Sequence, residues 1–93
     1  MIVAELRVVT LGEGTSQEAP VAAAVRVLEE RGFEPKVGPM GTVIESESLE
    51  DILLAVEAAH AKLRQTAGRI VTEITIDERL DHEETAESLS RIA

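Results

Sequence analysis

The order in which strand and helix patterns alternate along this chain leaves few folds open to it. Residues 2–11 are dense in β-branched side chains and predict a first strand, whereas residues 69–77 alternate in polarity and predict a last one. Between them, two helical patterns flank a short hairpin at residues 34–47. The chain thus reads as two βαβ-like halves, and right-handed crossovers place both helices on one face of a single sheet.

The sequence therefore predicts an α+β fold, a ferredoxin-like βαββαβ sandwich with an antiparallel sheet in the order 4-1-3-2. At 93 residues the chain has room for one core, so we expect a single domain over residues 1–93. Residues 1–79 form the predicted core, and residues 80–93 form a tail with a short C-terminal helix.

Local signals set the expected limits of the first helix. Thr15 and Glu18 fit a capping box, but Pro20 is tolerated only in a first turn and moves the start of regular helix towards Ala19. Gly32 is expected to close this helix.

The second helix is expected to begin after the N-cap Ser48 and to stop at Gly68. Its predicted apolar stripe consists of Leu49, Ile52, Leu53, Val56, Ala59, His60 and Leu63.

The hairpin carries the strongest turn signals. Two prolines bracket residues 34–40, which predicts a short strand at a sheet edge because proline cannot donate to a ladder. Gly38 and Gly41 flank a tight reversal, and residues 42–47 return as the next strand.

Composition excludes several partners. The formal net charge of −9 repels phosphate backbones, and the 1% aromatic content removes the stacking platform that single strands need, so no nucleic acid is expected. No apolar run reaches membrane-spanning length, and the lack of a signal peptide and of cysteine predicts a cytoplasmic protein. The negative field favours cationic or neutral ligands.

The core and the uncovered sheet face both point to self-association. A small core of Val, Ile, Leu and Ala without disulfides predicts an oligomer. The sheet face away from the helices mixes apolar and charged groups, so we expect it to pack on another subunit, with the charges paired or lining a pocket. Its expected residues are Val3, Glu5, Arg7, Val9, Val43, Glu45, Val71, Glu73 and Thr75.

Four segments together resemble the small thiamine-binding protein family, also described as UPF0045 or the MTH1187/YkoF-like group. They are residues 3–6, the Gly-Pro-Met-Gly-Thr stretch at 38–42, Ala59-His60, and residues 74–79. The resemblance implies a ferredoxin-like fold, a homotetramer built as a dimer of dimers, and binding of thiamine or its hydroxymethylpyrimidine part without catalysis. The positions that it marks are Glu5, Thr42, Glu45 and, less directly, His60.

The predicted ligand-binding residues are Glu5, Arg7, Met40, Thr42, Glu45 and Glu73. Carboxylates can accept from an aminopyrimidine amine or attract a thiazolium cation. Because Phe33 lies at a helix exit, Met40 or the apolar residues of a neighbouring subunit would have to take the place of a stacking ring. The same charges also fit a solvated face or inter-subunit ion pairs. Thr42 equally fits cross-strand pairing, and His60 fits a hydrogen-bonded core histidine.

No catalytic residue, metal ligand or cofactor is expected. The chain has no cysteine, and neither histidine lies near a serine at a strand end, so nucleophilic hydrolysis lacks its parts. Two alternatives remain open, since this fold hosts unrelated functions: a small enzyme, or a pure assembly or regulatory module.

Overall fold

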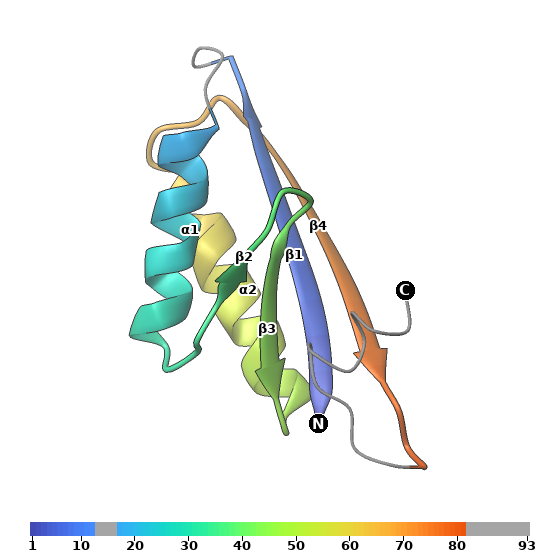
Figure 1. The fold of residues 1–93 in the computed structure, drawn as a ribbon. Coiled ribbons are helices and arrows are strands. Elements are labelled where there is room, and N and C mark those ends of the chain that lie inside the picture. Colours follow the sequence, from blue (N-terminus) through green and yellow to red (C-terminus); the bar gives the residue numbers. More distant parts are fainter. Residues whose placement is uncertain (13–16, 82–93) are drawn as a thin grey trace.

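A computed structural model describes residues 1–12 and 17–81, in which a four-stranded antiparallel sheet carries two helices on one face (Figure 1). The elements are β1 (Ile2–Leu11), α1 (Glu18–Glu30), β2 (Lys36–Val37), β3 (Thr42–Ser46), α2 (Leu49–Leu63) and β4 (Arg69–Glu78). The strands lie in the order β2-β3-β1-β4, which is the predicted 4-1-3-2 read from the other edge. The predicted ferredoxin-like sandwich is confirmed.

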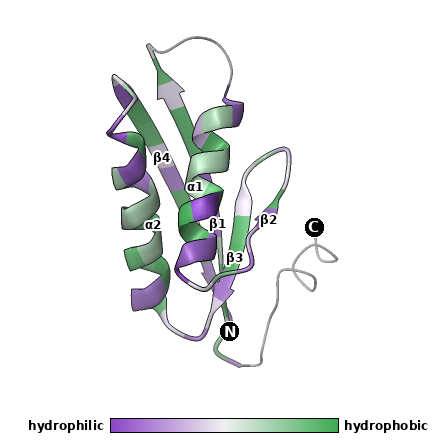
Figure 2. Cartoon of the chain, turned by 90° about the vertical axis from the view of Figure 1, so that its left-hand side faces the viewer, coloured by the Kyte–Doolittle hydropathy of each residue, from purple (hydrophilic) through white to green (hydrophobic). Residues whose placement is uncertain are grey.

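The core lies between the sheet and the helices, with β1 at its centre. The side chains of β1 alternate, so that Ala4, Leu6 and Val8 are buried towards the helices while Glu5 and Arg7 are exposed. The helices contribute Leu28 of α1 and, from α2, the residues Ile52, Ala55, Ala59 and Leu63. Much of β1, β3 and β4 is coloured as hydrophobic in Figure 2, whereas hydrophilic stretches interrupt both helices, as expected of a layered sandwich.

The start of α1 tests one expectation only in part. Its N-cap is Gln17, which makes no side-chain capping bond, and the predicted capping box of Thr15 and Glu18 depends on Thr15, which lies outside the described residues. A helix that begins at Glu18 keeps Pro20 within the first turn, where a missing N–H costs nothing.

The end of α1 follows the prediction. Gly32 has a φ of +92°, and its N–H donates to the Glu29 carbonyl at 3.0 Å while that of Phe33 donates to the Leu28 carbonyl at 3.1 Å. This is a Schellman ending, which needs the left-handed conformation that glycine adopts without strain.

The second helix begins as predicted and buries part of the predicted stripe. The Ser48 hydroxyl accepts from the Asp51 N–H at 3.2 Å, as an N-cap should. The buried positions are Ile52, Ala55, Ala59 and Leu63, whereas Leu49 and Leu53 are 40% and 46% exposed. The predicted stripe is thus wrong at both leucines, because the small Ala55 lets the helix approach its neighbours and turns Leu53 outward.

Several limits differ by a few residues. The second helix ends at Leu63 rather than at Gly68, because its last turn tightens through bonds such as that from the Thr66 N–H to the Leu63 carbonyl. Only Lys36 and Val37 of the predicted first hairpin strand pair with β3. The predicted C-terminal helix, from residue 82 onwards, lies outside the described residues.

Candidate functional site

The central strand loses its neighbour on one side halfway along its length. β3 pairs with β1 only from Ile2 to Leu6, whereas β4 pairs with it as far as Leu11. Within the described part of the chain, the edge of β1 opposite β4 therefore has no strand partner beyond Leu6. A pocket of about 230 Å³ lies along this edge, which we call the vacated edge.

The pocket is bounded by α1 on one side and by the β2–β3 hairpin on the other. Its walls are mostly apolar, and its volume is below the range of about 300–1,000 Å³ typical of drug-sized ligands, so it matches a single ring better than a large molecule. The lining consists of Leu6, Arg7, Val8, Val9, Gln17, Val21, Ala24, Leu28, Val37, Gly38, Pro39, Met40, Gly41 and Thr42.

One residue of the vacated edge is paired by a side chain instead of a strand. The Thr10 N–H donates to Gln17 Oε1 at 2.9 Å, and Gln17 Nε2 donates to the Thr10 carbonyl at 2.9 Å. The primary amide thus presents the same acceptor and donor as a neighbouring peptide group. Sequence reasoning missed Gln17, since nothing in its spacing marks a contact with Thr10.

Val8 presents the same pair of main-chain groups without a partner. In an antiparallel strand the N–H and C=O of one residue point to the same side, and this side alternates along the chain. The N–H and C=O of Thr10 point away from β4 towards Gln17, so the N–H and C=O of Val8, two residues earlier, point away from β4 as well. Within residues 1–12 and 17–81 no group bonds to the main chain of Val8, because β3 pairing stops at Leu6.

The hairpin gives the same alternation independently. The Gly38 N–H donates to the Gly41 carbonyl at 2.9 Å, so the main-chain groups of Gly41 face the β2 side. Those of the next residue, Thr42, therefore face β1. Thr42 pairs with Leu6, which accordingly faces β3. Val8, two residues further on, therefore faces the pocket with its main chain.

Thr42 adds a buried hydroxyl to the lining. The residue is 6% exposed and lies on the helix side of the sheet, opposite Leu6. In the described ranges its hydroxyl has no hydrogen-bond partner. A buried polar atom without a partner costs about 1–3 kcal/mol and calls for an explanation, and a polar ligand group would supply one.

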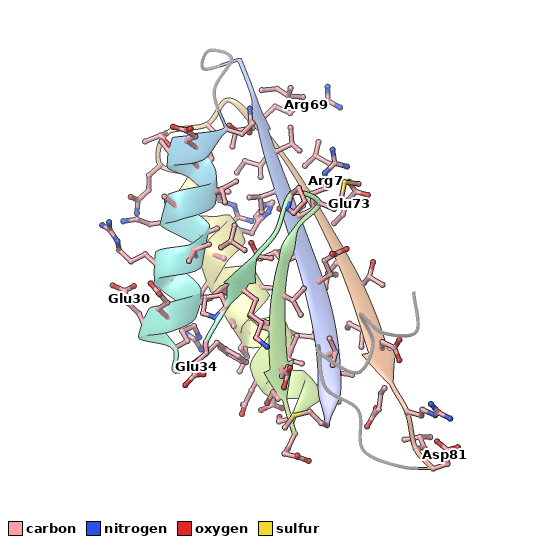
Figure 3. All side chains as sticks on the ribbon, in the orientation of Figure 1. Arg7, Glu30, Glu34, Arg69, Glu73 and Asp81 are labelled. Carbon is pink, nitrogen blue, oxygen red and sulfur yellow. The ribbon has the colours of Figure 1, made fainter. Side chains whose placement is uncertain are left out.

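The predicted carboxylates lie on the other face of the sheet. Arg7 Nη1 and Glu73 Oε1 are 3.2 Å apart on neighbouring strands, and Figure 3 shows both side chains projecting away from the helices. Their side chains are 57% and 61% exposed, so this ion pair adds little stability. Glu5 and Glu45 share this face by strand alternation.

The six predicted ligand-binding residues therefore do not all line this pocket. Met40 and Thr42 line the pocket, and Arg7 belongs to its lining while its guanidinium pairs with Glu73. None of the three predicted carboxylates, Glu5, Glu45 and Glu73, belongs to the lining.

Glu5 is nevertheless close to the pocket rim. A Cβ atom added to Gly41 would lie 2.9 Å from Glu5 Cγ and 3.2 Å from Glu5 Cδ. The Glu5 side chain thus packs on Gly41, which itself lines the pocket, and only glycine leaves room for it.

Glu45 lies beside the one aromatic residue of the chain. Glu45 and Phe33 line two adjoining hollows of about 340 and 300 Å³ at the far end of β3 from the pocket. The expectation that Phe33 sits at a helix exit is correct, but its position next to a predicted carboxylate was not foreseen.

His60 joins a helix to the sheet. Its Nδ1 lies 2.6 Å from the Thr72 hydroxyl of β4, which agrees with the structural reading of this residue. In the described part of the chain, no cluster of three or more candidate metal ligands occurs. Over the same ranges, no helix combines the length and the apolar character needed to span a membrane.

Comparisons with known proteins give a consistent picture. A family model described as thiamine-binding protein matches residues 4–91. A UPF0045 protein of Methanothermobacter thermautotrophicus is 42% identical over 83 residues, which cover 87% of this chain and 84% of that protein. The UPF0045 protein YqgV of Bacillus subtilis is 35% identical over 94 residues, covering 95% and 89%.

Solved structures agree with the fold. The crystal structure of MJ1052, a UPF0045 protein of Methanocaldococcus jannaschii, superposes with a TM-score of 0.88 at 34% identity and covers 98% of this chain and 93% of that one. A Thermotoga maritima protein proposed to act in thiamine biosynthesis or salvage superposes with a TM-score of 0.81 at 25% identity, covering 99% and 98%.

Proposed function

The chain belongs to the thiamine-binding protein family, and we propose that it binds thiamine or the hydroxymethylpyrimidine part of thiamine without catalysing a reaction. The observation that carries this proposal is the pocket at the vacated edge of β1. It combines apolar walls with the unpartnered hydroxyl of Thr42, and its volume of about 230 Å³ fits one ring.

The charge distribution supports thiamine in the same place. A pyrimidine ring held in the pocket would leave the thiazolium ring towards the rim, where Glu5 packs on Gly41. A carboxylate near a cation is stabilising, and the formal net charge of −9 attracts a cationic ligand to the whole surface.

Titration calorimetry with thiamine, thiamine phosphates and free hydroxymethylpyrimidine tests the proposal. A Val21→Phe substitution on the α1 wall fills the pocket and should abolish binding. Val25→Phe is the matched control, since Val25 is a half-buried residue of the same helix outside the pocket lining. Absence of heat with every compound at saturating concentration would overturn the proposal, as would undiminished binding by Val21→Phe.

The predicted carboxylates give a second, separable test. Glu5→Gln should weaken the binding of thiamine more than that of hydroxymethylpyrimidine, because only thiamine carries the positive charge. Glu45→Gln and Glu73→Gln remove carboxylates that lie outside the pocket lining and should change binding little. Loss of all binding in Glu45→Gln would place the ligand on the open sheet face instead.

We also propose that the protein is a homotetramer, a dimer of dimers, that associates through this open face. Val9 and Val71 pair in register on it and are half-buried, which supports an apolar centre beside the Arg7–Glu73 ion pair. Val71→Asp should lower the mass measured by light scattering, whereas Leu54→Asp on α2 should not. A monomeric mass for the unchanged protein would contradict the proposal.

The absence of catalysis is tested by recovery of the ligand. After prolonged incubation with the protein, thiamine should return unchanged in chromatography, since His60 is engaged with Thr72 and the described pocket lining contains no histidine or carboxylate. Conversion of thiamine that disappears in Val21→Phe would establish the small-enzyme alternative.

A further inference from the structure

We infer that the main chain of Val8 recognises the amino edge of an aminopyrimidine ring, with its N–H donating to a ring nitrogen and its C=O accepting from the adjacent amino group. The inference rests on the proposed function and specifies which part of the ligand is read. It assigns recognition to a peptide group rather than to the predicted carboxylates.

The neighbouring contact shows what this edge accepts. Gln17 meets the N–H and C=O of Thr10 with one acceptor and one donor held side by side in a planar amide, both at 2.9 Å. An aminopyrimidine offers the same side-by-side pattern, in which the ring nitrogen accepts and the amine donates. Val8 presents the same two groups, pointing the same way, two residues from Thr10.

The surroundings of Val8 favour a flat, partly apolar ligand. Val21, Ala24 and Leu28 of α1 lie on one side of the pocket and the hairpin turn on the other, so a ring on the strand edge is enclosed between them. The hydroxyl of Thr42 in the same lining offers a further donor and acceptor to ring substituents.

A peptide strand is a poorer occupant of the same edge. Strand addition draws its affinity from a row of main-chain bonds. Here Gln17 is already bonded to Thr10, and β3 pairing extends to Leu6. Among the residues that the structure describes, Val8 is thus the one position between them whose N–H and C=O both face the pocket without a partner. One residue supplies too few bonds for a strand but enough for a ring edge.

This mode of recognition predicts a strict requirement for the amino group. A pyrimidine in which hydrogen replaces the 4-amino group would leave the Val8 carbonyl buried and unpaired. Its affinity should fall about tenfold or more below that of hydroxymethylpyrimidine, whereas a purely hydrophobic pocket would accept both compounds alike.

The experiment combines this ligand pair with amide hydrogen exchange. Calorimetry compares hydroxymethylpyrimidine with its 4-desamino analogue, and exchange of the Val8 N–H is followed by NMR with and without hydroxymethylpyrimidine. We expect the Val8 amide to exchange at least about tenfold more slowly in the complex. The Thr10 amide, already bonded to Gln17, should change less and serves as the internal control.

A main-chain variant gives an independent measurement. Val8→Pro removes an N–H that points away from β4 and so leaves the β1–β4 ladder intact, whereas Val8→Ala keeps the N–H and removes two methyl groups from the buried side chain. Binding should be about tenfold or more weaker in Val8→Pro than in Val8→Ala. If Val8→Pro does not fold, exchange in the unchanged protein still decides the question.

The outcomes separate this inference from the proposed function. Equal binding of both pyrimidines, or an unchanged Val8 exchange rate in the complex, would overturn the inference about Val8. The proposed function would still stand if the protein binds hydroxymethylpyrimidine and Val21→Phe abolishes that binding. No binding of any thiamine compound would overturn both. Tight binding of an extended peptide in place of the pyrimidine would show that the edge serves strand addition.

Discussion

The side-chain amide of Gln17 pairs with the main chain of Thr10 as a neighbouring strand would, through two hydrogen bonds of 2.9 Å. The contact ties the start of α1 to the far half of β1, where β3 no longer reaches. It closes one end of the vacated edge and leaves Val8 open beside it. The pocket exists because this edge is capped at a single residue instead of being covered by a strand.

Replacing Gln17 tests this cap. Gln17→Ala should destabilise the protein by about 1–3 kcal/mol in urea unfolding, because Thr10 is 4% exposed and would keep a buried N–H and C=O without partners. Gln65→Ala, at an exposed turn position, is the control and should stay within about 0.5 kcal/mol of the unchanged protein. Equal unfolding free energies of the two variants would show that the Gln17–Thr10 contact does not contribute to stability.

Thr42→Val should separate binding from stability. Because the buried hydroxyl has no partner in the described part of the chain, its removal should leave the unfolding free energy unchanged or raise it by about 1 kcal/mol. Calorimetry with hydroxymethylpyrimidine should at the same time show weaker binding. A variant that loses stability and keeps full affinity would contradict a ligand role for this hydroxyl.

The two glycines of the hairpin should respond differently to alanine. A Cβ atom at Gly41 would lie 3.1 Å from the Leu6 carbonyl oxygen and 2.9 Å from Glu5 Cγ, so Gly41→Ala should cost about 1–3 kcal/mol and weaken thiamine binding. Gly38→Ala meets nothing closer than the Gly41 carbonyl oxygen at 3.5 Å and should be nearly neutral. Thermal melting of both variants checks this difference. Comparison of Gly41→Ala with the double variant Gly41→Ala/Glu5→Ala then shows how much of the destabilisation comes from the contact with Glu5.

Two adjacent residues of α2 test which face of the helix is buried. Ile52→Ala should cost about 2–5 kcal/mol, because Ile52 is 0% exposed in the core. Leu53→Ala, at a side chain that is 46% exposed, should cost far less. Similar losses in urea unfolding would show that Leu53 is covered, for example by another subunit.

The fold could be predicted because each of its signals is local. Alternation in residues 2–11, the glycine after α1 and the serine before α2 each specify a nearby backbone conformation, and the order of elements then leaves one sheet topology. The errors arose where tertiary contact decides. Ala55 rather than Leu53 is buried because helix approach favours a small side chain, which hydrophobicity alone does not rank highly.

The site was predictable only in part. Strand alternation correctly put Glu5, Arg7 and Glu73 on the open face, and the turn motif drew attention to Met40 and Thr42. That these residues lie on opposite sides of the sheet depends on Thr42 sharing a face with Leu6. The pocket floor depends on where β3 pairing stops, and an unpaired peptide group such as that of Val8 has no signature in a sequence.

The location of the ligand is tested most directly by NMR of isotopically labelled protein titrated with hydroxymethylpyrimidine. We expect the largest amide shift changes around the pocket, at Val8, Val21, Met40 and Thr42. Amides of Glu45 and Val71, away from the pocket lining, should move little. Changes confined to the open sheet face, or none at saturating ligand, would contradict binding at the vacated edge.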